Sequence, residues 1–191
     1  MSKVAVLTAM LGVLTMSEPA RSSTQDKTLD EVRALVSSAE AGGLVRTAKK
    51  TKPVDARPAK PGEVVVTVIA GEGKETQSAP AKPGDWVVRN RCQATGNEEY
   101  LVDGAKFTGR YLRTDAPPGP DGWQEHRPVG RAMRFIVLTP AHGEFAFTAP
   151  WGERMVAKTG DAIVQDSENP GDTYRVAAAS FACTYEVVKS S

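Results

Sequence analysis

The chain has 191 residues, a formal net charge of +1, 40% hydrophobic residues and 25% charged residues. This composition is close to the globular average, and the length allows one good core or two small ones. A nearly neutral chain has no overall field that attracts nucleic acids or anionic membranes, so nucleic acid is not an expected partner. Two cysteines are too few for a disulfide scaffold.

The segment 1–27 is expected to be an apolar and flexible N-terminal region. Residues 4–16 carry no charge but are too short to cross a bilayer as a helix, so no transmembrane helix is expected. The stretch also fits the core of a weak export signal, although only Lys3 precedes it. We therefore expect a cytoplasmic protein, with export as the alternative and a start at Met16 as a further one.

The segment 28–59 is predicted to be a helix followed by a basic linker. Thr28 and Glu31 have the spacing of a capping box, and Gly42 and Gly43 supply a stop. Between them, apolar residues recur at helical spacing: Leu29, Val32, Leu35, Val36 and Ala39. Residues 46–60 contain six basic side chains against Asp55 alone, and they read as a solvated connector. A phosphate-binding or acid-binding patch is the alternative, which the lack of interleaved aromatic residues disfavours.

Strand patterns begin near residue 60. The β-branched run at 64–69 is predicted to be a strand buried on both faces, and strands follow at 86–88 and 99–102. A Pro/Gly-rich connector at 115–129 breaks the chain. A second set of strands is predicted at 133–138, 144–148, 154–157, 162–165 and 173–177. The modules are therefore placed at 60–114 and 130–188.

One motif occurs in both modules. It reads KPGDWVV from residue 82 and KTGDAIV from residue 158. A Tyr–Phe–Tyr series with identical spacing follows each copy: Tyr100, Phe107 and Tyr111, then Tyr174, Phe181 and Tyr185. Glycine suits the positive φ of a tight turn, and the aspartate after it can accept backbone N–H hydrogen bonds. Aromatic residues four apart share one face of a helical turn and are predicted to pack in the core.

The predicted fold is therefore mainly β (α+β), with two similar small antiparallel β modules. Each module is closed by a short helical turn, and a helix precedes them. Because each module alone is near the lower size limit for a stable core, we expect the two to pack together.

The doubled motif resembles the small PGDYG-type domains, which occur in phages, prophages and bacteria, often as short uncharacterised proteins. The resemblance covers about residues 60–188. The chain departs from the pattern at Trp86 and Ala162, where the family has Tyr, and at Thr159, where it has Pro. The resemblance implies a small β domain and transfers no catalytic residue.

The sequence contains no recognisable catalytic or metal-binding pattern. His126 and His142 lack partners at metal-ligand spacing, and no phosphate loop or serine elbow is present. No catalytic residue, metal or cofactor is therefore predicted. In the cytosol, Cys92 and Cys183 are expected to be reduced and packed as small apolar groups, with a bridge as the alternative in an oxidising compartment.

Two short segments are predicted to bind a ligand. Trp151, Glu153 and Arg154 could stack on a flat molecule and hydrogen-bond to its edge, and Arg89 and Arg91 offer a similar surface in the first module. An ordinary hairpin turn with a half-buried Trp151 is the alternative interpretation.

The expected function is a non-catalytic binding or interaction module, associated with phage or mobile elements through the resemblance. Its partner, a protein or a small molecule, and its oligomeric state are not defined by the sequence. Two alternatives stay open. One is an enzyme acting on a nucleotide-like small molecule with Glu153 or Asp161 as base, and the other is a secreted or envelope structural protein.

Overall fold

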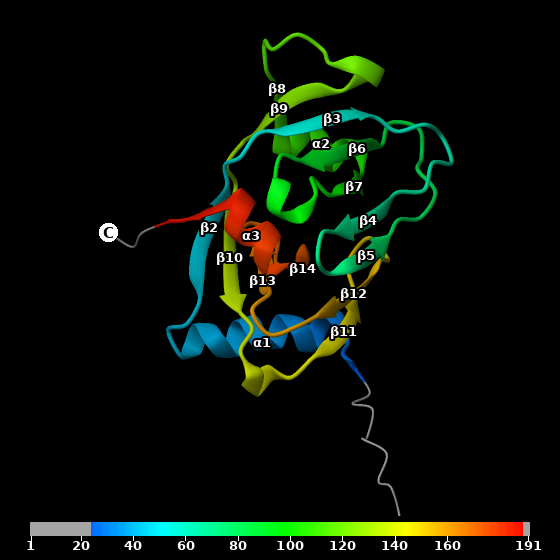
Figure 1. Ribbon diagram of the computed structural model, residues 1–191. Coiled ribbons are helices and arrows are strands. Elements are labelled where there is room, and N and C mark those ends of the chain that lie inside the picture. The colour runs from blue at the N-terminus through cyan, green and yellow to red at the C-terminus, as the bar shows by residue number, and fades with distance from the viewer. Residues whose placement is uncertain (1–23, 189–191) are drawn as a thin grey trace, which may run out of the picture.

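The computed structural model describes residues 24–188, and its main body consists of two β-sheets and their helices (Figure 1). The protein is mainly β, as predicted, and its strand pairs are antiparallel apart from the short parallel pair β1 (Gln25–Asp26) and β11 (Phe145–Thr148). No helix within residues 24–188 is both long and apolar enough to cross a membrane. The predictions made for residues 1–23 lie outside the described part.

Helix α1 (Leu29–Ala41) begins and ends where the sequence indicates. The Thr28 side chain accepts from the Glu31 backbone N–H, and the Glu31 side chain accepts from the Thr28 backbone N–H, so the predicted capping box is confirmed. Gly42 caps the C-terminus. Val32 and Val36 are fully buried in one core cluster with Ile136 and Ile163, and the helix lies at the bottom of Figure 1.

The first five-stranded sheet, sheet I, has the order β7-β6-β3-β9-β8. Its strands are β7 (Glu99–Val102), β6 (Trp86–Asn90), β3 (Val54–Pro58), β9 (Gln124–Pro128) and β8 (Tyr111–Arg113). Helix α2 (Gly104–Arg110) connects β7 to β8. Phe107 of this helix stacks on Trp86 at 4.3 Å and on Tyr111 at 5.2 Å, which joins the helix to the sheet's core.

The second five-stranded sheet, sheet II, has the order β14-β13-β10-β2-β15. Its strands are β14 (Thr173–Val176), β13 (Ala162–Asp166), β10 (Ala132–Val137), β2 (Arg46–Lys50) and β15 (Tyr185–Val187). Helix α3 (Ala178–Thr184) connects β14 to β15, as α2 does in sheet I. Phe181 packs between Phe135 and Tyr185, with ring separations of 4.7 and 4.9 Å.

Two segments predicted to be linkers are strands instead. The basic segment 46–60 contains β2 and β3, and the connector 115–129 contains β9. All three are inner strands of their sheets. Their apolar residues are small and few, such as Ala48 and Ala56, and they alternate with charged ones. The charge and proline content concealed this period-two pattern.

The chain passes between the two sheets at two equivalent places. Strand β2 runs directly into β3, yet β2 pairs with β10 and β15 in sheet II, while β3 lies in sheet I. Strand β9 runs directly into β10, yet β9 pairs with β3 and β8 in sheet I. Sheet II therefore contains β2, whose next strand along the chain lies in sheet I. Sheet I likewise contains β9, whose next strand lies in sheet II.

Two hairpins extend from the sheets. They are β4 (Val66–Ile69) with β5 (Gly73–Gln77), and β11 with β12 (Arg154–Ala157). The prediction that the β-branched run at 64–69 is buried on both faces is wrong. Thr67 and Ile69 are buried, but Val66 and Val68 are exposed, because β4 belongs to a two-stranded sheet with only one covered face.

The repeated Gly–Asp pairs form equivalent turns, as predicted. Gly84 and Gly160 both have a φ of +93°, which favours glycine. The Asp85 carboxylate accepts from the Lys82 backbone N–H at 2.8 Å, and Asp161 accepts from Lys158 at 2.9 Å. Each aspartate thereby closes the turn that leads into β6 or β13.

A disulfide joins Cys92 and Cys183, which corrects the expectation of two reduced thiols. Cys92 precedes the short 3-10 helix η1 (Gln93–Thr95), and Cys183 lies on α3, with a Cα–Cα distance of 6.1 Å. The bridge thus links a loop of sheet I to the helix of sheet II. Contact between residues 91 positions apart cannot be read from local sequence patterns.

Candidate functional site

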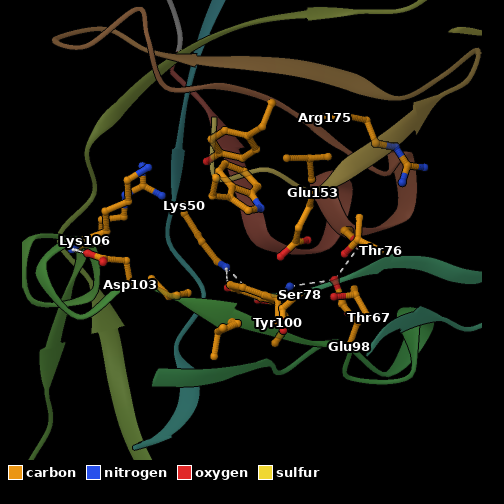
Figure 2. Close-up of a pocket in the computed structure, with 18 of the residues that line it drawn as sticks. Lys50, Thr67, Thr76, Ser78, Glu98, Tyr100, Asp103, Lys106, Glu153 and Arg175 are labelled. Carbon is orange, nitrogen blue, oxygen red and sulfur yellow. Dashed lines mark hydrogen bonds between the residues drawn. The ribbon is translucent and has the colours of Figure 1, made fainter. Parts of the chain in front are cut away.

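A cavity of about 680 Å³ lies between sheets I and II. This volume falls in the range of small-molecule sites. All four tyrosines of the chain line it, together with Trp151. Polar side chains from both sheets and both hairpins complete the lining, among them Lys50, Glu98 and Glu153 (Figure 2). The tyrosines come from equivalent elements: Tyr100 on β7, Tyr111 on β8, Tyr174 on β14 and Tyr185 on β15.

The tyrosines form two hydroxyl pairs. The hydroxyl oxygens of Tyr100 and Tyr111 are 3.1 Å apart, and those of Tyr174 and Tyr185 are 3.4 Å apart. Within residues 24–188, only the first pair has an ammonium group bound to it. Lys50 Nζ donates to the Tyr100 hydroxyl at 2.7 Å, to Asn90 Oδ1 at 2.8 Å and to the Tyr111 hydroxyl at 3.4 Å.

Strand register explains why the two pairs differ. In sheet II, Lys50 of β2 is the direct partner of Tyr185. At the equivalent position in sheet I, Pro128 of β9 is the partner of Tyr111. Lys50 reaches from its own sheet to the tyrosines of the other, whereas Pro128 supplies no charge to Tyr174 and Tyr185.

The electrostatic environment separates these phenols. Burial and the neighbouring Tyr111 raise the pKa of Tyr100 well above its usual value. Burial and the neighbouring Tyr174 likewise raise the pKa of Tyr185. Burial opposes ionisation of Tyr111 as well, but Lys50 and the hydrogen bond from Tyr100 outweigh it and lower its pKa.

Most carboxylates around the cavity are already engaged. Glu98 is buried and accepts from Ser180 Oγ at 2.7 Å, from Asn90 Nδ2 at 2.8 Å and from the Thr95 hydroxyl. The Asp172 carboxylate binds Lys106 Nζ at 3.1 Å and also Arg110. These groups hold α2 and α3 against the opposite sheet.

The arginine in β14 closes another side of the cavity. The side chain of this residue, Arg175, is 3% exposed. Its guanidinium binds the carboxylates of Asp161 at 2.7 Å, Glu72 at 3.2 Å and Glu75. Burial raises the pKa of Glu75 despite this pairing. The Asp161 carboxylate also accepts backbone N–H groups of Lys158 and Ala178. Asp161 is therefore a structural group, which argues against its predicted alternative role as a base.

Glu153 differs from these groups, because its carboxylate has no hydrogen bond or ion pair with any residue in 24–188. It is half-buried and lines the cavity. Figure 2 shows its carboxylate pointing inward, toward the wall that carries Tyr100 and Ser78. A carboxylate in this position is available to a ligand.

Of the predicted binding residues, the structure brings Trp151 and Glu153 together at this cavity. Trp151 is 39% exposed, contacts the Tyr174 ring edge-on at 5.4 Å and has Lys106 Nζ 5.5 Å from its ring centre. Arg154 does not line the cavity, and it pairs with Asp26 at 2.7 Å on the surface.

Arg89 and Arg91 lie at a separate, open pocket beside Cys183. Both bind Asp55, Arg91 also pairs with Glu125, and the Arg89 guanidinium stacks on Trp123 at 4.1 Å. The sequence prediction therefore joined two places that the fold keeps apart. These arginines bind their own neighbours and have less capacity to bind a ligand.

Sequence reasoning missed Lys50, Asn90 and the role of the tyrosine pairs. The repeated tyrosines carried a usable signal, because their hydroxyls need buried hydrogen-bond partners in addition to packing. Lys50 carried none, since it stood among other basic residues in a predicted linker.

No cluster of three or more potential metal-binding side chains occurs in the described part of the chain. Comparisons with protein-family models, curated proteins and solved structures found no match. The resemblance to PGDYG-type domains therefore stays a prediction, and function must be argued from the cavity itself.

Proposed function

We propose that this protein binds a small planar organic molecule in the cavity between its two sheets. The observation that carries the proposal is one partly open cavity of about 680 Å³ lined by four tyrosines and Trp151. Sites of this size, with aromatic walls and a few convergent polar groups, are typical of small-molecule binding. A small molecule is thus favoured over a protein as the partner.

The polar groups favour a ligand that carries both a hydrogen-bond acceptor and a donor or acidic hydrogen. Lys50 and Lys106 lie on one side of the view in Figure 2, and Glu153 lies toward the other, near the hydroxyl groups of Thr76 and Ser78. A hydrogen-bond acceptor would meet the tyrosines beside Lys50, while a donor or cation would meet Glu153. Trp151 supplies a flat face near Glu153 for stacking.

The binding proposal is tested by thermal shift and calorimetry with a panel of planar aromatic acids, ketones and amines. Trp151→Ala and Glu153→Gln are expected to weaken a hit about tenfold or more, because each removes a direct contact. Arg154→Gln is the matched control, since Arg154 is adjacent in sequence but lies outside the cavity. A hit unaffected by both cavity variants would place its binding site elsewhere and refute the proposal.

We also propose that the chain contains two copies of one unit that have exchanged a strand. The matching sheet orders, the equivalent connections through α2 and α3 and the equivalent Gly–Asp turns support this. The units then lie within 46–113 and 124–187, each starting with its exchanged strand. We include in this proposal a PGDYG-type origin and a phage association, for which the repeated motif is the sole support. Expressing residues 46–113 separately tests it, and a stable monomeric fold would contradict the need for exchange.

The disulfide supports the exported alternative over a cytoplasmic location, because structural disulfides persist in oxidising compartments. N-terminal sequencing of the protein purified from its source, with thiol counting, tests this. An uncleaved N-terminus with two free thiols would favour the cytoplasm.

A further inference from the structure

The duplicated tyrosine pairs differ in one respect that packing does not require. Tyr111 is buried and the other three tyrosines are half-buried. Both pairs bring two hydroxyls within hydrogen-bond distance, yet within residues 24–188 only one pair receives a lysine. Lys50 is half-buried, and shielding an ammonium group from water without a carboxylate partner is costly unless its hydrogen bonds are satisfied. Lys50 forms no ion pair within residues 24–188, and it directs its donors at two phenol oxygens and one amide oxygen.

We propose that Tyr111 is a proton donor and acceptor for a carbonyl oxygen of the bound molecule, with Glu153 as the base that removes a proton from the adjacent carbon. This inference rests on the proposed binding function and specifies its ligand as an enolisable ketone or keto acid. Lys50 and Tyr100 are positioning residues, because they act through the Tyr111 oxygen.

One arrangement of the hydrogen bonds leaves the Tyr111 hydrogen free for a ligand. A lysine ammonium has three donors, and here all three have acceptors. The Tyr100 hydroxyl has two acceptors in reach, the Tyr111 oxygen at 3.1 Å and Asn90 Oδ1 at 3.3 Å. When Tyr100 donates to the Tyr111 oxygen, the Tyr111 hydrogen has no acceptor left within this cluster and can point to a ligand. The Tyr111 oxygen then receives hydrogen bonds from Lys50 and Tyr100, which would stabilise it as a phenolate after it has given up its proton.

The charged and titratable groups around the phenol agree with this role. The lowered pKa of Tyr111 makes it the phenol that ionises most readily, while burial raises the pKa of Tyr100. A general acid–base works best when its pKa approaches the working pH. The groups that face the Tyr100–Tyr111 pair are Lys50 from β2, Arg110 from α2, Glu98 from the turn before β7, and Tyr185 from β15.

The proposed step is balanced without a cofactor. The Glu153 carboxylate takes a proton from the carbon next to the carbonyl, and the C–H electron pair becomes the carbon–carbon double bond. The carbonyl π electrons take the Tyr111 proton, which leaves an enol, a Tyr111 phenolate and a protonated Glu153. Return of the Glu153 proton to the same carbon gives exchange, and its return to another carbon gives isomerisation.

The first experiment follows tyrosine ionisation by ultraviolet absorbance as the pH is raised. One tyrosine of the folded wild-type protein is expected to titrate below the usual value. Tyr111→Phe should remove this transition, Tyr185→Phe should retain it, and Lys50→Met should raise it by about 1–3 pH units. Lys50→Arg should restore part of the shift, which a purely structural lysine would not predict.

The second experiment measures proton exchange in D₂O by NMR with three aryl ketones: phenylpyruvate, phenylacetone and benzoylacetone. Wild type is expected to accelerate loss of the α-proton signal of at least one probe. Tyr111→Phe and Glu153→Gln should each slow this exchange about 100-fold or more. Arg154→Gln is the control outside the cavity and should retain the wild-type rate. Circular dichroism of each variant verifies folding.

The outcomes separate this inference from the binding proposal. Exchange at the uncatalysed rate with all three probes overturns the inference, as does full activity of folded Tyr111→Phe. If a probe raises the melting temperature without exchange, binding stands and proton transfer fails. If no probe or panel compound raises it, both proposals fail.

Discussion

Removing the disulfide between Cys92 and Cys183 tests how much the long-range link contributes to stability. The paired cysteines are separated by 91 residues, so the bridge restricts nearly half of the unfolded chain. The loop-entropy relation gives a loss of about 4.6 kcal/mol at 25 °C for a loop of this length. Because single domains are stable by roughly 5–15 kcal/mol, the protein without its disulfide should lose a large share of its free energy of unfolding.

The assay is urea unfolding of wild type, of wild type in dithiothreitol, and of the double variant Cys92→Ala/Cys183→Ala. With an m-value of about 2 kcal/mol/M, the midpoint should fall by roughly 2 M urea. Reduction alters no side-chain volume, so it separates the bridge from the packing of buried Cys92. A loss below about 1 kcal/mol, with native circular dichroism and a mass-verified bridge in wild type, would refute the loop-entropy reasoning.

Two further predictions concern α2 and the tyrosines. Gly104→Ala should destabilise the protein by about 1–3 kcal/mol, because a Cβ there would lie 2.3 Å from the Gly84 carbonyl oxygen. Gly109→Ala in the same helix meets nothing within 4 Å and should be neutral or stabilising by up to about 1 kcal/mol; equal destabilisation in both thermal melts would contradict this reading. Burial raises the pKa of Tyr100 and of Tyr185, so the folded state keeps protons that the unfolded state loses near pH 10. The contribution of Tyr100 and Tyr185 should therefore be full below pH 10 and fall above it by up to about 1.4 kcal/mol per pH unit for each tyrosine. Tyr111, whose pKa is lowered, is ionised in both states above pH 10 and adds no slope there, so a flat profile in denaturation at pH 10–11 would contradict this.

Part of the site could be predicted from sequence and part could not. Trp151 and Glu153 stood out because they occupy a turn where the two motif copies differ, and both line the cavity. Arg89 and Arg91 were chosen by the same reasoning, but Asp55 and other neighbours engage them at a different pocket. Which charges pair with each other depends on contacts between distant segments, and a linear pattern does not contain that information.

Local features were determined by the sequence itself. The capping box at Thr28, the positive-φ glycines at 84 and 160, and most of the predicted strands depend on residues within one turn or one strand. Tertiary structure alone decided which sheet received β2 and β9, how Cys92 met Cys183, and which tyrosine pair received Lys50. The physical reason is that strand periodicity specifies a buried face but not the partner that covers it, so the pairing of distant strands settles the chemistry of the cavity.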